Sequence, residues 1–119
     1  MATFKSFEEI ESWKSSQELC KMIFSQINNP VFSNDIALKD QINRASGSIM
    51  DNIAEGSGLG GNKEFVLFPG YSSDSCAEVK SQLIRAMDRS YITNDDFNRM
   101  YSLTNNIGRM NGGLIDYFI

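Results

Sequence analysis

Residues 38–53 read LKDQINRASGSIMDNI, and the spacing of their apolar side chains decides the fold class. These side chains recur at steps of three and four residues, which is the period of an α-helix with one buried face. The stripe consists of Leu38, Ile42, Ala45, Ile49 and Ile53. The stretch therefore predicts an amphipathic helix, and residues 33–35 before it offer several N-capping side chains.

A polar flank accompanies this stripe. At 100° per residue, Gln41, Ser48 and Asn52 fall roughly 60–100° to one side of the apolar stripe, and Arg44 and Glu55 lie further round on the same side. The predicted helix thus presents a polar edge beside its buried face.

A second helix with a polar flank is predicted to begin near Asn62, which is a good N-cap residue. Its apolar stripe consists of Phe65, Phe68, Val79, Leu83 and Ala86. Its flank consists of Glu64, Tyr71, Ser75, Glu78, Gln82 and Arg89. Pro69-Gly70 interrupts the pattern, because proline removes a backbone hydrogen bond and clashes with the preceding turn at a cost of about 3 kcal/mol. A kink or a break is therefore predicted near residues 66–70.

Two further helices complete the pattern. One is predicted over residues 7–28, with Ser6 and Glu9 at capping-box spacing, and its predicted buried face is Ile10, Trp13, Gln17, Cys20, Phe24 and Ile27. The other begins at Thr93, with Asp96 at capping-box spacing, and its predicted face is Phe97, Met100, Thr104, Ile107, Met110, Leu114 and Phe118. Its poor helix formers predict close helix packing or fraying: Gly108, Gly112 and Gly113.

Four amphipathic helices with short loops predict one all-α domain over residues 1–119, an antiparallel up-down-up-down four-helix bundle. The joint between the second and third helices contains Gly56, Gly58 and Gly61, which spell G-x-G-x-x-G. In a dinucleotide-binding loop this motif follows a strand of a βαβ unit. Here it follows a helical pattern, so it indicates a glycine-rich joint, and no cofactor is predicted.

The composition disfavours catalysis. None of the 119 residues is histidine, so Ser–His and Cys–His nucleophile pairs are excluded, and the commonest metal ligand is missing. Cys20 and Cys76 are expected to be free thiols, and two cysteines are too few for an ordinary zinc site. Glu55, Glu64 and Glu78 are interpreted as hydrogen-bonding groups at the bundle edge. No catalytic residue and no metal site is predicted.

Two further expectations concern location and partners. No apolar run approaches the roughly 18–20 residues that span a bilayer, and residues 1–14 lack the apolar core of a signal peptide, so a cytoplasmic location without a membrane partner is expected. The formal net charge of −4 disfavours broad affinity for nucleic acid. A local basic patch stays open, formed by Lys39, Arg44, Arg85 and Arg89. The alternative is a solvated face whose arginines pair with nearby carboxylates.

Several segments resemble one family along nearly the whole chain. Residues 41–56, QINRASGSIMDNIAEG, resemble the hallmark segment of the four-helix-bundle family called 23S rRNA intervening-sequence proteins. Residues 63–68, KEFVLF, and residues 75–83, SCAEVKSQL, are similar to that family's third helix. The segments FEEIESW at residues 7–13, YITNDDF at 91–97 and GLIDY at 113–117 fit as well.

This resemblance implies a four-helix bundle that assembles as a ring-like homopentamer, and a related branch works with a reverse transcriptase and nucleic acid in diversity-generating retroelements. The family's recurring polar set falls here on the flank residues of the second and third helices: Arg44, Ser48, Asn52, Glu55, Glu64, Ser75, Glu78 and Gln82. These residues are predicted to form a polar network between the two helices or a subunit interface.

Two functional hypotheses follow. The leading one is a non-enzymatic homo-oligomeric adaptor or scaffold whose partner is a second copy of itself. The alternative is an accessory protein that binds RNA or DNA, or a nucleic-acid-processing protein, through the basic surface around Arg44, Arg85 and Arg89.

Overall fold

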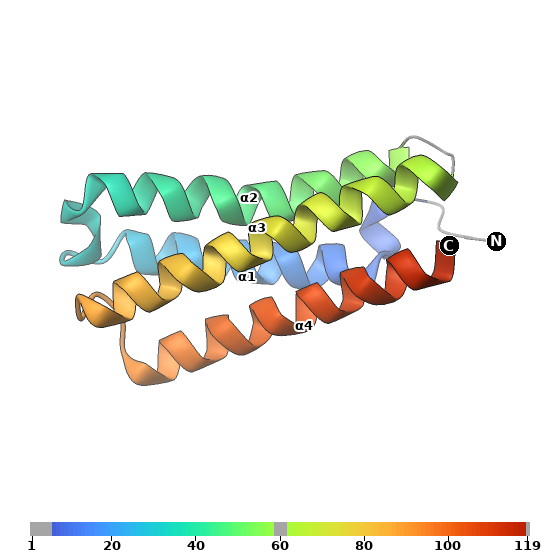
Figure 1. The fold of residues 1–119 in the computed structure, drawn as a ribbon. Helices are drawn as coiled ribbons and strands as arrows, with labels where there is room; N and C mark the ends of the chain where they lie inside the picture. The colour runs from blue at the N-terminus through green and yellow to red at the C-terminus, as the bar shows by residue number, and fades with distance from the viewer. Residues whose placement is uncertain (1–5, 59–61, 119) are drawn as a thin grey trace.

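The computed structural model describes residues 6–58 and 62–118, and the side chains of residues 6–56 and 68–114. Four α-helices lie side by side in an up-down-up-down bundle (Figure 1): α1 (Glu11–Ile27), α2 (Ile36–Gly58), α3 (Asn62–Asp88) and α4 (Asn94–Phe118). Two short 3₁₀ turns, η1 (Phe7–Glu9) and η2 (Phe32–Asn34), precede α1 and α2. The described residues contain no strand, and the predicted all-α bundle is confirmed.

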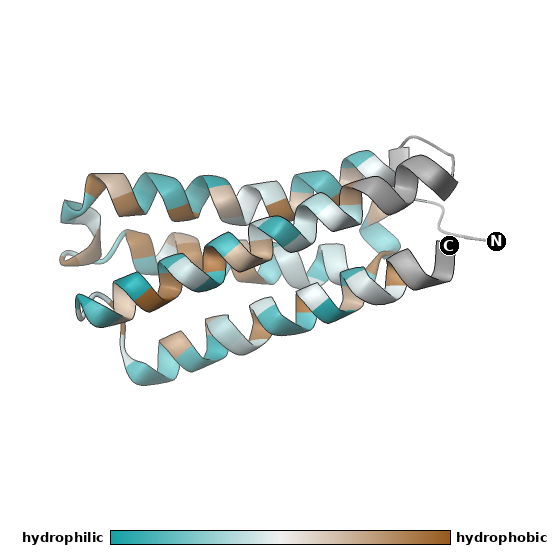
Figure 2. Ribbon diagram, viewed as in Figure 1, coloured by the Kyte–Doolittle hydropathy of each residue, from teal (hydrophilic) through white to brown (hydrophobic). Residues whose placement is uncertain are grey.

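The predicted α2 stripe is confirmed in full. All five of its apolar side chains are buried, and they pack with the inner faces of α1, α3 and α4. In Figure 2, hydrophobic bands alternate with hydrophilic ones along the helices, as amphipathic helices around a single core require. The start of α2 also agrees, since Asp35 Oδ1 accepts the Leu38 backbone N–H at 3.1 Å and so caps the helix.

The predicted inner face of the first helix is correct at Ile10 and Ile27, but between them it is wrong by roughly 80° of helix rotation. Phe24 is 64% exposed and Gln17 is exposed. Besides Ile27, the α1 side chains that are buried are Ser12, Ser16, Leu19 and Ile23. The two serines fit the core because their small hydroxyls need little room, and Ser16 Oγ donates to the Ser12 carbonyl at 2.5 Å. A stripe chosen for its aromatic residues misses such positions.

The helix ends agree with the sequence in part. Thr93 Oγ1 accepts the Asp96 N–H at 3.2 Å, as a capping residue of α4 should. The Ser6 cap is wrong, because its side chain makes no capping hydrogen bond and residues 7–9 form a separate 3₁₀ turn. At the other end of the molecule, the Asn29 side chain accepts the backbone N–H groups of Val31 and Phe32 and donates to the Tyr91 carbonyl at 3.1 Å. It thereby joins the α1–α2 loop to the α3–α4 loop.

The break predicted near Pro69 does not occur. Helix α3 continues through Pro69, which is buried. Just beyond it, Ser72 Oγ donates to the Ile49 carbonyl of α2 at 3.0 Å, and Asn111 Nδ2 of α4 donates to Ser72 Oγ at 2.9 Å. Packing and these hydrogen bonds hold α3 against two neighbours, which offsets the cost of proline in a helix.

The glycines of α4 do not mark close helix contacts, so that interpretation is wrong. A Cβ atom built on Gly108, Gly112 or Gly113 meets nothing within 4 Å. These glycines therefore cost helix stability without a packing gain in the single chain.

We expect Gly108→Ala to raise the free energy of unfolding by about 0.5–1 kcal/mol, because alanine loses less backbone entropy in a helix and its methyl group has room here. Urea unfolding followed by circular dichroism measures the change. A lower stability for Gly108→Ala would show that this face is tightly packed.

Candidate functional site

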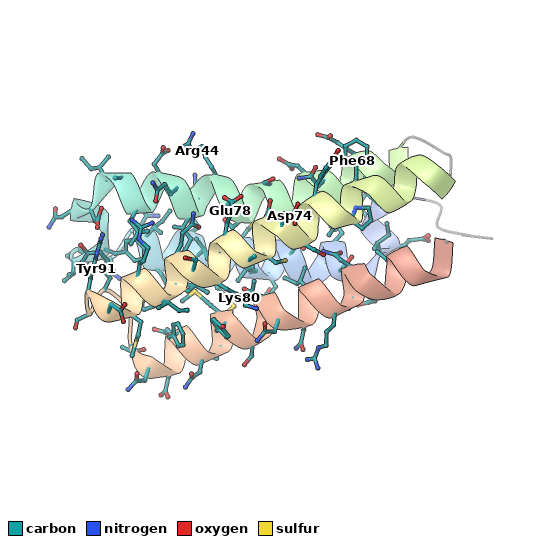
Figure 3. All side chains as sticks on the ribbon, in the orientation of Figure 1. Arg44, Phe68, Asp74, Glu78, Lys80 and Tyr91 are labelled. Atoms are coloured by element: carbon teal, nitrogen blue, oxygen red, sulfur yellow. The ribbon has the colours of Figure 1, made fainter. Side chains whose placement is uncertain are left out.

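A polar groove runs between α2 and α3. Residues of both polar flanks line it, and Figure 3 labels Arg44 on α2 and Glu78 on the neighbouring α3. The groove has a volume of about 490 Å³ and is open to solvent along one side. Its lining residues are Gln41, Arg44, Ala45, Ser48, Ser75, Glu78 and Gln82. Five of the eight predicted network residues therefore meet in one place.

The floor of the groove is a small hydrogen-bonded cluster. Ser75 Oγ donates to Ser48 Oγ at 3.1 Å, and Asn52 Nδ2 lies 2.9 Å from Ser48 Oγ and 2.8 Å from the Ser48 carbonyl. Asn52 thus joins the cluster from one turn further along α2. Glu55 lies exposed near the end of α2, and the side chain of Glu64 lies outside the described residues.

Two groups in the groove have no partner in the described part of the chain. Gln82 is only 8% exposed, and its Oε1 atom is buried without a hydrogen-bond donor. One turn away on α3, the exposed Glu78 carboxylate forms no ion pair with any described residue. Buried polar groups in folded proteins are nearly always hydrogen-bonded, so the Gln82 oxygen, which the chain itself encloses, is one of few exceptions among the described residues, whereas Glu78 is open to a partner.

The predicted basic residues divide into two groups. Arg44, Arg85 and Arg89 lie on the α2–α3 face, where Arg44 pairs with Asp40 at 3.0 Å and Arg85 donates to the neutral Gln41 Oε1 at 3.0 Å. Lys39 lies on α2, half-buried and outside the groove lining. The face therefore combines cations and carboxylates.

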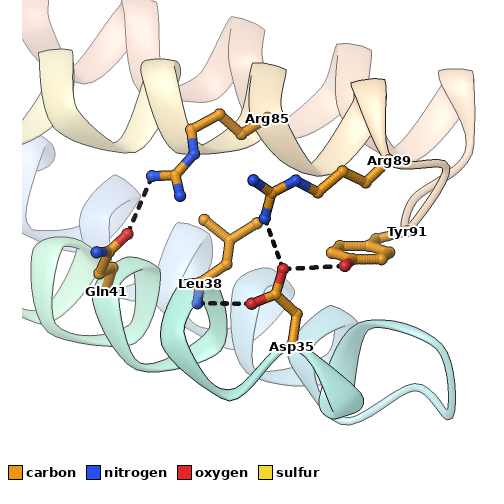
Figure 4. A network of polar contacts seen from close by, with 6 residues as sticks. All are labelled: Asp35, Leu38, Gln41, Arg85, Arg89 and Tyr91. Atoms are coloured by element: carbon orange, nitrogen blue, oxygen red, sulfur yellow. Dashed lines mark hydrogen bonds and ion pairs between the residues drawn. The ribbon is translucent and has the colours of Figure 1, made fainter.

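Arg89 belongs to a cluster at one end of the bundle (Figure 4). Asp35 Oδ2 accepts hydrogen bonds from Arg89 at 2.6 Å and from the Tyr91 hydroxyl at 2.9 Å, while Oδ1 caps α2 through the Leu38 N–H. The Leu38 N–H, with Tyr91 and Arg89, holds the pKa of Asp35 below its usual value. The same bond to Asp35 raises the pKa of Tyr91. This carboxylate links the start of α2 to the end of α3.

We expect Asp35→Asn to lower the melting temperature at neutral pH and to weaken the dependence of stability on acid pH. A carboxylate whose pKa is lower in the folded state stabilises the fold above its unfolded pKa of about 4, and this stabilisation disappears as pH falls through the folded pKa. Thermal unfolding between pH 2 and pH 7 measures both effects.

The matched control for this measurement is Asp88→Asn, at an exposed carboxylate on α3. If wild type and Asp35→Asn had the same pH profile of stability, the stabilising role assigned to the Asp35 carboxylate would be contradicted.

The thiols offer no reactive centre. Both cysteines are free, as predicted, and Cys76 is buried while Cys20 is half-buried. Burial raises the pKa of Cys76 to about 11, and burial also raises the pKa of Cys20, whose Sγ lies 3.2 Å from the Ser46 carbonyl. Thiolate is the reactive form, so neither thiol is activated as a nucleophile. Among the described residues, no cluster of Cys, Asp and Glu is placed to hold a metal ion.

The sequence reasoning missed the buried side chain Asn111, which lies in the core with Ser72. Its spacing was a usable signal, because Thr104, Ile107 and Asn111 follow one another at three and four residues. Asn111 Oδ1 and Ser12 Oγ are buried without described partners.

Comparison with known proteins identifies the family. The family model described as 23S rRNA-intervening sequence protein matches residues 8–113. The chain belongs to this family. Among curated proteins, the comparison finds no match.

A solved structure supports the fold of this intervening-sequence family member. The crystal structure of a protein with unknown function from the S23 ribosomal protein family of Bacteroides thetaiotaomicron VPI-5482 superposes with a TM-score of 0.79. The two sequences are 19% identical, and the match covers 87% of this chain and 97% of the other. At that identity the likeness shows the shared bundle alone.

For this family member, the α2–α3 groove coincides with the segments that carry the family resemblance. Residues 41–56 supply its α2 wall and residues 75–83 supply its α3 wall. None of the helices in the described part of the chain is long and apolar enough to cross a membrane.

Proposed function

We propose that this intervening-sequence family member is a non-enzymatic scaffold or adaptor that assembles with further copies of itself, and that the α2–α3 groove is a subunit interface. The observation that carries this proposal is the exposed carboxylate of Glu78, which lies in an open polar groove and forms no ion pair with any described residue. The family resemblance adds the expectation of a ring of five subunits.

The energetics favour an occupant that supplies polar donors. A second chain can supply such donors from its amide or cationic side chains. Glu78 offers the same chain a site for a charge-assisted hydrogen bond. The cluster of Ser48, Asn52 and Ser75 holds the groove floor in one arrangement before binding, which lowers the entropic cost of association.

A non-enzymatic role fits the chemistry of the chain. The sequence contains no histidine, and the pKa values of both thiols are raised. The family is described without a reaction, and the solved relative is described as a protein with unknown function.

We expect the wild-type chain to be an oligomer at micromolar concentration and Glu78→Arg to shift it towards the monomer. Charge reversal at an interface carboxylate should raise the dissociation constant at least about tenfold, which corresponds to about 1.4 kcal/mol. Size-exclusion chromatography with light scattering, over a range of concentrations, measures the mass.

The matched control is Glu18→Arg, which makes the same change at an exposed position of α1 outside the groove. A wild-type chain that stays monomeric at these concentrations would rule out the scaffold proposal.

A second candidate function is binding of RNA or DNA, because Arg44, Arg85 and Arg89 share the α2–α3 face. Arg85 is half-buried and contacts the neutral Gln41, whereas the more exposed Arg44 and Arg89 pair with Asp40 and Asp35. A guanidinium that is not paired with a carboxylate neutralises a phosphate without first breaking an ion pair.

If the chain binds structured rRNA, we expect Arg85→Glu to weaken binding more than Arg44→Glu, and to reduce the salt dependence by roughly one counterion. Gel-shift titrations at several salt concentrations measure both values, with Lys14→Glu on α1 as the control. Lack of a shift at low salt would rule out this candidate.

A further inference from the structure

The opposite side of α2 forms a second groove with α1, and its floor is made of small side chains. The groove has a volume of about 590 Å³. Its lining residues are Gln17, Cys20, Lys21, Phe24, Asn43, Ser46 and Gly47. Cys20 Sγ lies 3.2 Å from the Ser46 carbonyl, so the two helices meet along the floor, and a Cβ atom built on Gly47 meets nothing within 4 Å. The space above this floor is therefore open to side chains from outside the chain.

The groove leads to an apolar corner of the molecule, where α1 ends and α2 begins (Figure 1). Phe24 is 64% exposed, Val31 56% and Ile36 76%. Three of the five large apolar side chains that the described residues expose thus lie on the α1–α2 connection or within one turn of it. Exposed apolar side chains that gather in one region are typical of an interaction surface.

The charges beside this apolar surface have one sign. Lys21 lines the groove, and Lys39 lies on α2 one turn before Asn43. Neither lysine forms an ion pair with any described residue. None of the lining residues is acidic, although the formal net charge of the chain is −4.

The neighbouring carboxylates lie outside the groove. Asp40 pairs with Arg44, which lines the groove on the other flank of α2. Asp51 lies one turn beyond Gly47, at the end of the groove away from the lysines, and Glu18 on α1 is exposed outside the lining. The groove therefore complements a partner that is both apolar and anionic.

The shape of the groove favours a helix as that partner. The α1 wall extends from Gln17 to Phe24, which is two helical turns or about 10 Å. An amphipathic helix that lies in a groove presents its apolar anchors at the same spacing, with steps of three, four and seven residues.

A second copy of this chain is a poor occupant. Two α1–α2 faces would bring lysines together without carboxylates between them. The α2–α3 groove has no large exposed apolar side chain among its lining residues, so it offers nothing to cover Phe24.

We infer that the α1–α2 groove binds an acidic amphipathic helix of a different protein. The apolar side chains of this helix cover Phe24 and fill the space above Gly47, and its carboxylates pair with Lys21 and Lys39. The inference goes beyond self-assembly, which the proposed function places on the other flank of α2, and it states the chemistry of the protein that an adaptor would hold.

The test uses designed helical peptides as probes. The first carries leucines at positions i, i+4 and i+7 with glutamates beside them, and the second carries lysines in place of the glutamates. We expect the wild-type chain to bind the acidic peptide at least about tenfold more tightly than the basic one, and Lys21→Glu/Lys39→Glu to reverse this preference. Fluorescence anisotropy of labelled peptides measures the dissociation constants. The control Arg109→Glu, at an exposed cation of α4, should bind as wild type does.

Two substitutions test the apolar part of the groove. Gly47→Leu should weaken binding of the acidic peptide at least about tenfold, because the new side chain fills the groove. Leucine favours a helix more than glycine does and has room here, so this variant should unfold at a temperature no lower than that of wild type. Phe24→Ser should also weaken binding, whereas Tyr71→Ser, at an exposed aromatic side chain of α3, should not.

The outcomes separate this inference from the proposed function. Equal binding of the two peptides, or no binding of the acidic one, overturns the inference. A smaller mass of Gly47→Leu or Phe24→Ser in light scattering overturns it too, because the groove is then a contact between copies. Phosphatidylserine vesicles that bind wild type but not Phe24→Ser, without peptide binding, would assign the face to a lipid surface instead. A monomeric wild type refutes the scaffold proposal alone, since the peptide titration does not require an oligomer.

Discussion

The register between α2 and α3 is the constraint on which the candidate site depends. Inside the core it is held by the buried Ser72 hydroxyl, which donates to the Ile49 carbonyl and accepts from Asn111. At the groove floor it is held by the contact between Ser48 and Ser75. A shift of α3 by one residue would break these bonds and leave polar groups buried without partners, at about 1–3 kcal/mol each. The same register places the walls of the groove opposite each other.

The buried face of α2 was predictable from sequence, whereas most of the buried face of α1 was not. The α2 stripe contains only aliphatic residues and alanine, so its period gave the buried face directly. On α1 the aromatic and sulfur-containing residues form one stripe, while Ser12 and Ser16 share the buried stripe with aliphatic residues. Hydropathy ranks serine as polar, but the Ser16 hydroxyl bonds within its own helix and so costs little in a core, whereas Ser12 Oγ has no partner among the described residues. Tertiary packing therefore determines which of the two α1 stripes is buried, because both have the helical period.

The residues of the candidate site were predictable from sequence, but their hydrogen-bond partners were not. Helix arithmetic and the family resemblance both selected the polar flank, and five of its members line one groove. Which of them lack partners depends on the distances between α2 and α3. Only the folded structure shows that Asn52 bonds to Ser48 whereas Gln82 Oε1 has no donor. Asn111 and the unbroken helix at Pro69 likewise depend on contacts with other helices.

The two grooves give α2 a place at the centre of the proposed assembly. In the single chain this helix has one flank facing α1 and the other facing α3, and each flank ends in an open groove. The α2–α3 groove holds the cation of Arg44 as well as the carboxylate of Glu78, so a partner must offer charges of both signs to match it. A contact in the wrong register would bury these charges without partners, and that penalty contributes to specificity as much as the bonds formed.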